Sequence, residues 1–271
     1  MIKLLSLVNH GYRIAATGCC FICFGIGGIL FSVIVFPLQR LLISDLPHRQ
    51  KIARHTVHLS FKFFIGMMHQ LRIFNFDFSA SAQLQQARGN IIIANHPCLI
   101  DVVALIAMTP NADCVVKAGL FRNPFIRGVI TSTGYISNSD PDALINDCAA
   151  SLASGNNLII FPEGTRTTPG SLLSFQRGAA NIALRSQASF LALSIRCQPT
   201  TLTKQEAWYQ VPATKPTLAI HFLKEIRVTD YSNADSPSLA ARQLTRDLQH
   251  YYRQVVNRYE CTETGSEAFN H

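Results

Sequence analysis

The longest apolar run of the chain lies near its N-terminus. Residues 14–36 form 23 positions without a charged side chain, with Arg13 before them and Pro37 and Arg40 after them. A helix of this length reaches about 34 Å, enough to cross a hydrocarbon core of about 30 Å. A cleaved signal peptide would have a shorter apolar region with a small-residue cleavage site behind it. The pattern therefore predicts a transmembrane or deeply embedded anchor, and a buried core helix is the alternative.

The next segment predicts an amphipathic helix over residues 56–70. Its large apolar side chains recur at spacings of 4, 3, 4 and 3, on one face: Val57, Phe61, Phe64, Met68 and Leu71. A helix that lies on a membrane surface fits this stripe as well as a helix that covers a globular domain. Alternating phenylalanines between residues 74 and 78 then predict a strand.

From about residue 90, short apolar runs alternate with helical patterns. The runs predict strands at residues 91–94, 114–116, 158–161, 190–195 and 218–222. Helices are expected at residues 102–108, 141–153 and 178–185, and a last helix begins at Ser236-Pro237. The alternation predicts an α/β fold with a largely parallel sheet flanked by helices, behind an N-terminal membrane segment.

This reading divides the chain into three parts. Residues 1–55 are the membrane anchor and a basic linker, residues 56–260 the α/β domain, and residues 261–271 a polar tail that begins to fray after Tyr259. Basic residues are more frequent after the apolar run than before it, which places the bulk of the chain in the cytoplasm, at the inner membrane.

Composition agrees with a membrane partner. The chain is 48% hydrophobic and 15% charged, with a net charge of +8, whereas about 25% of residues are charged in an average soluble domain. A basic, charge-poor surface suits anionic phospholipids. Without a dense Lys/Arg run, the charge does not indicate a nucleic-acid partner. Cys20 and Cys23 form a lone C-x-x-C inside the apolar run, so no metal site is predicted.

The first segment with chemical content is Asn95-His96-Pro97-Cys98-Leu99-Ile100-Asp101, directly after the predicted strand 91–94. Open α/β folds place their ligands at this carboxyl edge of the sheet. Asp101, in the first turn of the next helix, can fold back on the imidazole of His96 and fix its tautomer, so that the other ring nitrogen acts as a general base. The alternative is an ordinary surface histidine.

The second segment is Phe161-Pro162-Glu163-Gly164-Thr165-Arg166, which follows another buried strand. Gly164 permits a tight turn, and the guanidinium of Arg166 suits a pair of phosphate oxygens. Glu163 can orient that arginine or bind a hydroxyl. An ordinary surface Glu–Arg pair is the alternative for this segment alone, but both segments would open at one edge of a parallel sheet.

Together the two segments resemble the motifs of the lysophospholipid acyltransferase family, typified by 1-acylglycerol-3-phosphate acyltransferases. The H-x4-D box (His96, Asp101) and the F-P-E-G-T-R box (residues 161–166) are both present without substitution. The resemblance spans residues 56–225.

The resemblance implies transfer of an acyl group from an acyl-CoA or acyl carrier protein thioester to the hydroxyl of a lysophospholipid, without a cofactor. In this reading His96 and Asp101 are catalytic, and the acceptor is bound by a larger group of residues: Asn95, Lys117, Glu163, Gly164, Thr165 and Arg166. The acceptor hydroxyl is itself the nucleophile, so no acyl-enzyme is needed.

Two departures from the family pattern concern substrate contacts. An arginine that commonly follows the middle glycine-aromatic segment is missing after Gly134-Tyr135-Ile136, and a late Pro-Val element is absent around residues 191–195. A different acceptor, such as an amino-acid-linked lipid, therefore stays an alternative, as does a non-catalytic lipid-binding protein. A serine hydrolase is disfavoured because the chain has no G-x-S-x-G elbow.

Overall fold

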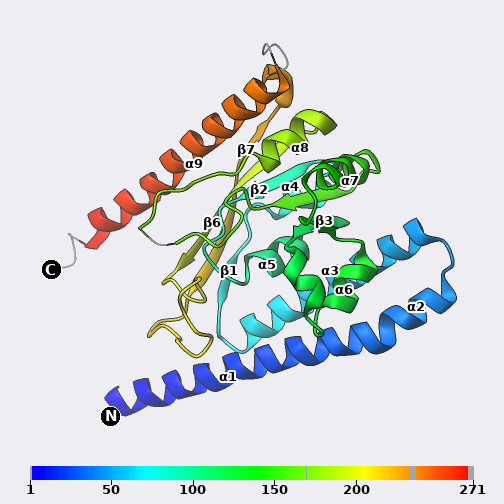
Figure 1. The fold of residues 1–271 in the computed structure, drawn as a ribbon. Helices are drawn as coiled ribbons and strands as arrows, with labels where there is room; N and C mark the ends of the chain where they lie inside the picture. The colour runs from blue at the N-terminus through cyan, green and yellow to red at the C-terminus, as the bar shows by residue number, and fades with distance from the viewer. Residues whose placement is uncertain (1, 169, 232–235, 268–271) are drawn as a thin grey trace.

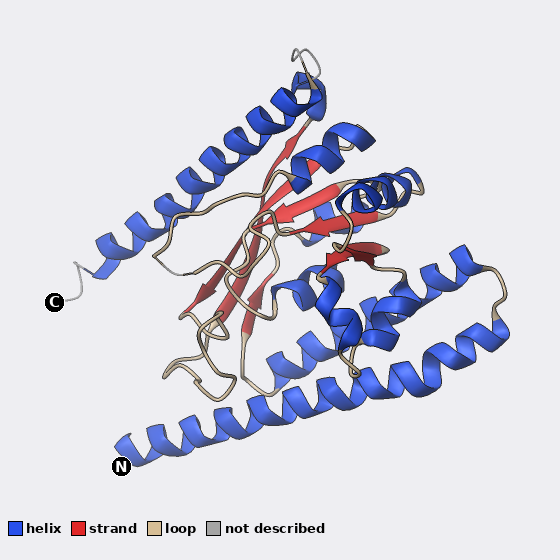
Figure 2. Ribbon diagram, viewed as in Figure 1, coloured by secondary structure: helices blue, strands red, loops and turns tan. Residues whose placement is uncertain are grey.

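The structure, a computed structural model, describes residues 2–168, 170–231 and 236–267. Within these residues, seven strands form one sheet in the order β1-β7-β6-β2-β5-β3-β4 (Figures 1 and 2). The strands are β1 Asn75–Asp77, β2 Ile91–Ala94, β3 Ala112–Val116, β4 Ile136–Ser137, β5 Asn157–Ile160, β6 Phe190–Gln198 and β7 Thr217–Ile226. Among the strand pairs of the described residues, only β6–β7 is antiparallel, so the expected largely parallel α/β sheet is confirmed.

Helices cover both faces of this sheet (Figure 2). The α-helices are α1 Ile2–Leu30, α2 Phe36–Leu42, α3 Leu46–Gln70, α4 Ser81–Gln86, α5 Asp101–Met108, α6 Arg127–Thr133, α7 Pro141–Ala153, α8 Gly178–Ser186 and α9 Pro237–Glu267. A π-helical turn, η1 Phe31–Val35, joins α1 to α2, and two 3-10 helices are η2 Ala118–Arg122 and η3 Val228–Tyr231.

Strand β2 shows why the sequences of the central strands are continuous apolar runs. Ile92 points into a core shared with α3 and α5, whereas Ile91 and Ile93 point into the core under α7, α8 and α9. All three side chains are fully buried. Because both faces are covered, every position of the strand must be apolar, and each buried isoleucine contributes about 1.5–3 kcal/mol.

Helix α3 resolves the ambiguity of the apolar stripe. Val57, Phe64 and Met68 are buried in the core on the α5 side of the sheet, so the stripe covers the domain. The helix begins at Leu46, with the side chain of Asp45 accepting a hydrogen bond from the His48 amide. It therefore runs without a break across the expected boundary after residue 55.

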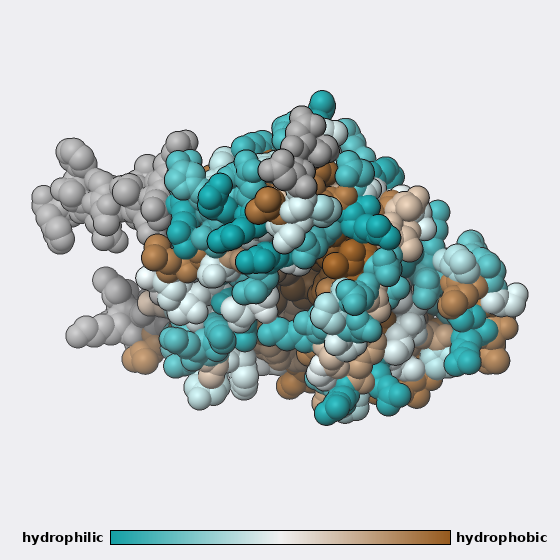
Figure 3. Space-filling model, turned by 45° about the horizontal axis from the view of Figure 1, so that its top comes forward, coloured by the Kyte–Doolittle hydropathy of each residue, from teal (hydrophilic) through white to brown (hydrophobic). Residues whose placement is uncertain are grey.

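The apolar N-terminal run forms the second half of α1 and the π-helical turn η1, and α1 lies along the domain (Figure 1). The stretch Leu7–Leu42 is long and apolar enough to cross a membrane, and 17% of its most apolar window is buried. One side packs on the domain through Ala16 and Cys20, while Ile22 and Ile26 on the other side are about 60% exposed. In Figure 3 hydrophilic residues dominate the visible face, while hydrophobic residues show in a central hollow and in smaller groups toward the edges.

Two boundaries differ from those expected. The strand predicted at residues 158–161 ends at Ile160, which leaves Phe161 in the following turn. The last helix continues to Glu267, beyond the point after Tyr259 where we expected a fraying polar tail, and residues 268–271 lie outside the described part.

Candidate active site

The two sequence motifs meet at the carboxyl edge of the sheet. Strands β2 and β5 are parallel neighbours, with Ile93 of β2 opposite Ile160 of β5. The segment from Asn95 follows β2 and the segment from Phe161 follows β5, so both leave the sheet on the same side. Neighbouring parallel strands thus bring together residues that are 67 positions apart.

His96 and Asp101 form the expected pair. Nδ1 of His96 lies 2.9 Å from Oδ2 of Asp101, and the same carboxylate oxygen accepts the Cys98 amide at 2.8 Å. The imidazole stacks on Phe161 with 4.1 Å between ring centroids. A carboxylate on Nδ1 favours the tautomer with its proton there, so Nε2 carries the lone pair of a general base.

Asp101 is fully buried at the start of α5. Burial raises the pKa of its carboxyl, because the charged form loses its hydration, while the hydrogen bonds from His96 and the Cys98 amide and the charge of Arg166 act in the opposite direction. The proximity of Arg166 links the second motif to the catalytic pair electrostatically.

A hydrogen-bonded clamp on the backbone of His96 joins the two motifs. The His96 amide donates to Oγ1 of Thr167 at 2.9 Å and faces Oε1 of Glu163 at 3.2 Å. The Thr167 amide donates to the His96 carbonyl at 2.7 Å, and the Thr167 hydroxyl donates to Glu163 at 2.6 Å. Thr167 follows the second motif and has no sequence pattern of its own, so sequence reasoning did not find it.

Glu163 sits in a tight turn that its neighbour makes possible. Gly164 has φ of 68° and donates its amide to the Phe161 carbonyl, which closes the turn. Burial raises the pKa of Glu163, opposed by hydrogen bonds from the Thr167 hydroxyl and the His96 amide. The carboxylate therefore faces the backbone of the first motif, and Glu163 does not form an ion pair with Arg166 in the described part of the chain.

Arg166 is fixed from the far side of the site. Its Nη1 donates to the carbonyls of Leu202 and Thr203, at 3.0 and 2.8 Å, in the segment that follows β6. These two bonds occupy one end of the guanidinium. Among the described residues, Nε and Nη2 make no hydrogen bond to the protein, so they can bind a ligand oxygen.

Asn95 points toward β6. Its amide nitrogen donates to the Ile195 carbonyl at 2.7 Å, and its amide oxygen accepts the Ile195 amide at 2.8 Å. The buried side chain of Asn95 thus binds both the amide and the carbonyl of Ile195. These two bonds take the place of the backbone pairing between β2 and β6, which ends at Ala94 and Leu193. The structure places Asn95 at the base of the site, next to His96.

The two remaining residues predicted to bind the acceptor, Lys117 and Thr165, lie at the periphery of the site. Lys117 directly follows β3, the other neighbour of β5, and its side chain is exposed at the same edge of the sheet. Thr165 is partly exposed in the turn between Gly164 and Arg166. The motif residues gather around His96, with Lys117 two strands away from β2.

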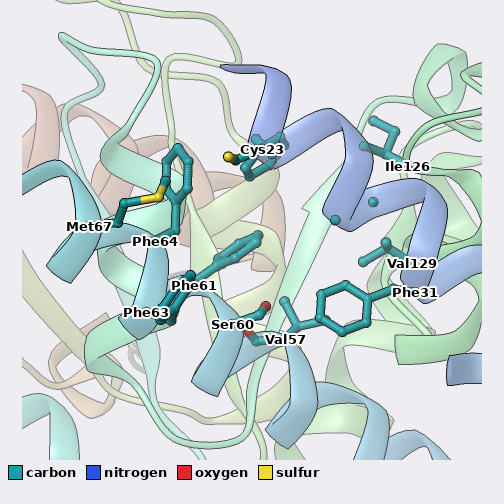
Figure 4. Close-up of a pocket in the computed structure, with 13 residues that line it drawn as sticks. Cys23, Phe31, Val57, Ser60, Phe61, Phe63, Phe64, Met67, Ile126 and Val129 are labelled. Atoms are coloured by element: carbon teal, nitrogen blue, oxygen red, sulfur yellow. The ribbon is translucent and has the colours of Figure 1, made fainter. Parts of the chain in front are cut away.

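An apolar cavity of about 250 Å³ lies between α1, α3 and the start of α6. Figure 4 shows Phe31, Phe61 and Phe64 directed into the space between the helices. Gly27 also lines the cavity, and a Cβ added there would meet no atom within 4 Å. Because its lining is mostly apolar, with Ser60 as an exception, the cavity suits a hydrocarbon chain.

With this geometry in view, comparison with known proteins identifies the class. The family model described as "Acyltransferase" matches residues 75–196, which contain both motifs. Residues 75–196 therefore match an acyltransferase domain, and the resemblance to the lysophospholipid acyltransferase family is confirmed.

Individual relatives agree. The chain is 27% identical over 193 residues to human 1-acyl-sn-glycerol-3-phosphate acyltransferase beta, covering 66% of this chain and 63% of that protein. It is 36% identical over 106 residues to 1-acyl-sn-glycerol-3-phosphate acyltransferase of Helicobacter pylori, covering 36% of this chain and 45% of the relative. The matched part is thus less than two thirds of either relative.

A solved structure shows the same fold over the whole length. The crystal structure of the 1-acyl-sn-glycerophosphate (LPA) acyltransferase from Thermotoga maritima superposes with a TM-score of 0.61 at 20% sequence identity. The match covers 100% of this chain and 99% of that one, including the N-terminal helices.

Proposed function

We propose that this protein is a membrane-bound 1-acylglycerol-3-phosphate O-acyltransferase, which takes a fatty acyl group from an acyl-CoA or acyl carrier protein thioester and produces phosphatidic acid. The observation that carries the proposal is the His96–Asp101 pair at 2.9 Å, held beside Arg166 at the carboxyl edge of the sheet. The side chains seen to contact His96 in the described chain are those of Asp101, Glu163, Thr167 and Phe161, and none is a Ser or Cys, which supports a substrate hydroxyl as nucleophile.

The reaction follows from the position of the protons. Nε2 of His96 removes the proton of the acceptor hydroxyl as the oxygen attacks the thioester carbonyl, and a carbon–oxygen bond forms. The carbon–sulfur bond then breaks, and the imidazolium returns the proton to the departing sulfur. Asp101 keeps Nδ1 protonated and stabilises the positive charge on the ring in between.

The acceptor phosphate is assigned to the cationic side chains of the edge. We propose that Arg166 binds it through Nε and Nη2, and that Lys117 adds a second positive charge. Gly164 and Thr165 shape the turn beside it. Glu163 and Asn95, whose polar groups already bind the protein backbone, are proposed to position His96 and the strand ends around it.

The apolar cavity is proposed to hold the acyl chain. Its walls come mainly from α1 and α3, and Phe61 and Phe64 of α3 are among the aromatic side chains that line it (Figure 4). An alkyl chain is stabilised there by about 0.8 kcal/mol for each methylene removed from water. The depth of this cavity would then set the preferred chain length.

The packing of α1 supports an embedded helix over a spanning one. Tyr12 donates to the Leu71 carbonyl, Phe24 packs on Phe64, and Gly28 lies against the Phe125 carbonyl, so contacts with the domain recur along the helix. A helix that crossed the bilayer would carry these polar neighbours into hydrocarbon. We propose that α1 lies in one leaflet with its exposed apolar side toward the lipid, on the cytoplasmic face where both thioester donors occur.

Acyl transfer by membranes that contain each variant tests the proposal. Lysophosphatidic acid is supplied with acyl-CoA or acyl carrier protein thioester, and His250→Ala, an exposed histidine on α9, serves as control. We expect His96→Ala to lose at least about a hundredfold in rate and Asp101→Asn a comparable factor. A wild-type rate in His96→Ala would refute the mechanism.

A further inference from the structure

The segment that joins β6 to β7, residues 199–216, connects α1 to the catalytic edge, and we call it the β6–β7 loop. In Figure 1 it is the yellow segment that reaches from the sheet toward α1. The sequence motifs do not include it, and it carries the only tryptophan of the chain, Trp208.

One end of the β6–β7 loop is fixed to α1. Buried Arg13 donates from Nη1 to the Ala213 carbonyl and from Nη2 to the Thr214 carbonyl, both at 3.0 Å. The indole of Trp208 lies on Gly18, where an added Cβ would stand 3.2 Å from the ring. A glycine at this position therefore allows the indole to approach the helix closely.

The aromatic residues of the loop are exposed beside the apolar side of α1. Trp208 is 46% exposed and Tyr209 is 56% exposed, with their rings edge to face at 5.7 Å between centroids. The indole also neighbours Phe21, and the next residue of the helix, Ile22, is 62% exposed. The exposed apolar surface is thus continuous from α1 onto the loop.

The other end of the β6–β7 loop is hydrogen-bonded to residues at the carboxyl edge of the sheet, beside His96. The Leu202 carbonyl accepts the Leu99 amide at 3.1 Å and Nη1 of Arg166 at 3.0 Å. Leu202 has φ of 54°, an uncommon conformation for a residue with a side chain, and its side chain is buried in the core. One short loop therefore binds both the proposed membrane helix and the proposed phosphate-binding arginine.

We propose that the β6–β7 loop is a second membrane-contacting element, with Trp208 and Tyr209 at the level of the lipid headgroups. Indole and phenol rings have an apolar body and a polar group, and they concentrate at membrane–water interfaces for that reason. Exposed Lys204 in the same loop suits anionic headgroups. The inference rests on the proposed function in one respect, that α1 is embedded in one leaflet.

This second contact would fix the orientation of the enzyme on the bilayer. A single embedded helix can rotate about its own axis, whereas a helix and a loop beside it define a plane. Since the loop also holds Arg166, the height of the phosphate-binding group above the lipid surface would be set by the depth of the loop. An acceptor that stays in the membrane could then reach His96 without leaving the leaflet.

The single tryptophan allows a direct test in the full-length protein. The protein is bound to phosphatidylglycerol/phosphatidylcholine vesicles with bromine atoms placed near the headgroups or near the chain ends. Binding is measured separately by co-sedimentation. We expect the Trp208 emission to shift to shorter wavelength and to be quenched more strongly by the shallow bromines. The matched control is Trp208→Phe/Leu239→Trp, which moves the tryptophan to an exposed position on α9.

The outcomes separate the two proposals. Protein that sediments with the vesicles while Trp208 stays unquenched, like the α9 control, would overturn the loop contact and leave the embedded α1 standing. Protein that does not sediment would overturn both. As a second readout, Trp208→Ala should weaken vesicle binding by about tenfold. About half of the Trp208 side chain is exposed in the free protein, and the variant loses the free energy of burying that surface in the membrane. Unchanged vesicle binding in this variant would also contradict the proposal.

Discussion

Replacing Thr167 with valine removes one hydroxyl from the contact between the two motifs and leaves the side chain nearly the same in shape. In the native chain this hydroxyl accepts the His96 amide at 2.9 Å and donates to Glu163 at 2.6 Å. A neutral hydrogen bond contributes about 0.5–1.5 kcal/mol and one to a charged group about 1.5–3 kcal/mol. The combined cost of Thr167→Val is therefore about 2–4.5 kcal/mol.

The cost divides between stability and catalysis. The part lost from the folded state lowers the melting temperature by a few degrees. The part lost only in the transition state, where the imidazolium must stay aligned with Asp101, lowers kcat by about tenfold for each 1.4 kcal/mol. We expect kcat to fall about thirtyfold or more, while KM for the acceptor stays within about threefold, because Thr167 does not face the proposed phosphate site.

Steady-state kinetics and thermal unfolding of three variants check this prediction. Thr167→Ser keeps the hydroxyl and should recover most of the wild-type kcat. Thr168→Val, the neighbouring position, removes a hydroxyl that makes no hydrogen bond among the described residues and serves as the control. If Thr167→Val keeps both kcat and the melting temperature of the wild type, the clamp does not hold the catalytic histidine, and the reasoning fails.

Further substitutions test other parts of the site. Arg166→Ala should raise KM for lysophosphatidic acid about tenfold or more in initial-rate assays, since a charge-assisted bond to phosphate is lost; an unchanged KM would place the phosphate elsewhere. Gly27→Leu fills the apolar cavity and should shift the preference toward shorter acyl donors in a chain-length series, whereas Gly25→Leu, outside the cavity, should not. Asn95→Ala leaves the amide and carbonyl of Ile195 without partners, at about 1–3 kcal/mol each, and should lower the melting temperature by several degrees; a variant as stable as the wild type would contradict this.

The parts of the site that the sequence predicts are those determined by local chain geometry. His96 and Asp101 are five residues apart across one turn, and the Cys98 amide between them binds the same carboxylate. The pair is therefore set by the hexapeptide from His96 to Asp101. The sequence also predicts that the two motifs lie close together. Both follow apolar runs that are expected to be parallel strands of one sheet, and the carboxyl ends of such strands lie at the same edge.

Contacts between distant segments were not predictable in the same way. The hydrogen bond from Arg166 to Thr203 joins residues 37 positions apart, and the bonds from Asn95 to Ile195 join residues 100 apart. Arg166 and Asn95 bind backbone groups in these contacts. Every residue carries such groups, so no side-chain pattern in the sequence predicts which residue is the partner. The stripe on α3 shows a related limit, since a lipid surface and a protein core select the same apolar spacing.

The burial of Asp101 shows what this arrangement costs and why the two motifs occur together. One carboxylate oxygen binds His96 and the Cys98 amide, while Oδ1 is buried without a hydrogen-bond partner among the described residues. Such a group destabilises the folded protein, and an apolar residue in the first turn of α5 would pack more favourably. The carboxylate is tolerated because the His96 ring donates to it and Arg166 adds a positive charge, and these two interactions offset part of the cost of its burial. Arg166 comes from the second motif, so the acid that orients the base depends on the same residue that is proposed to bind the acceptor. Loss of the second motif would remove this positive charge from beside Asp101, and loss of the first would remove the carboxylate from beside Arg166, which gives a physical reason for finding both intact.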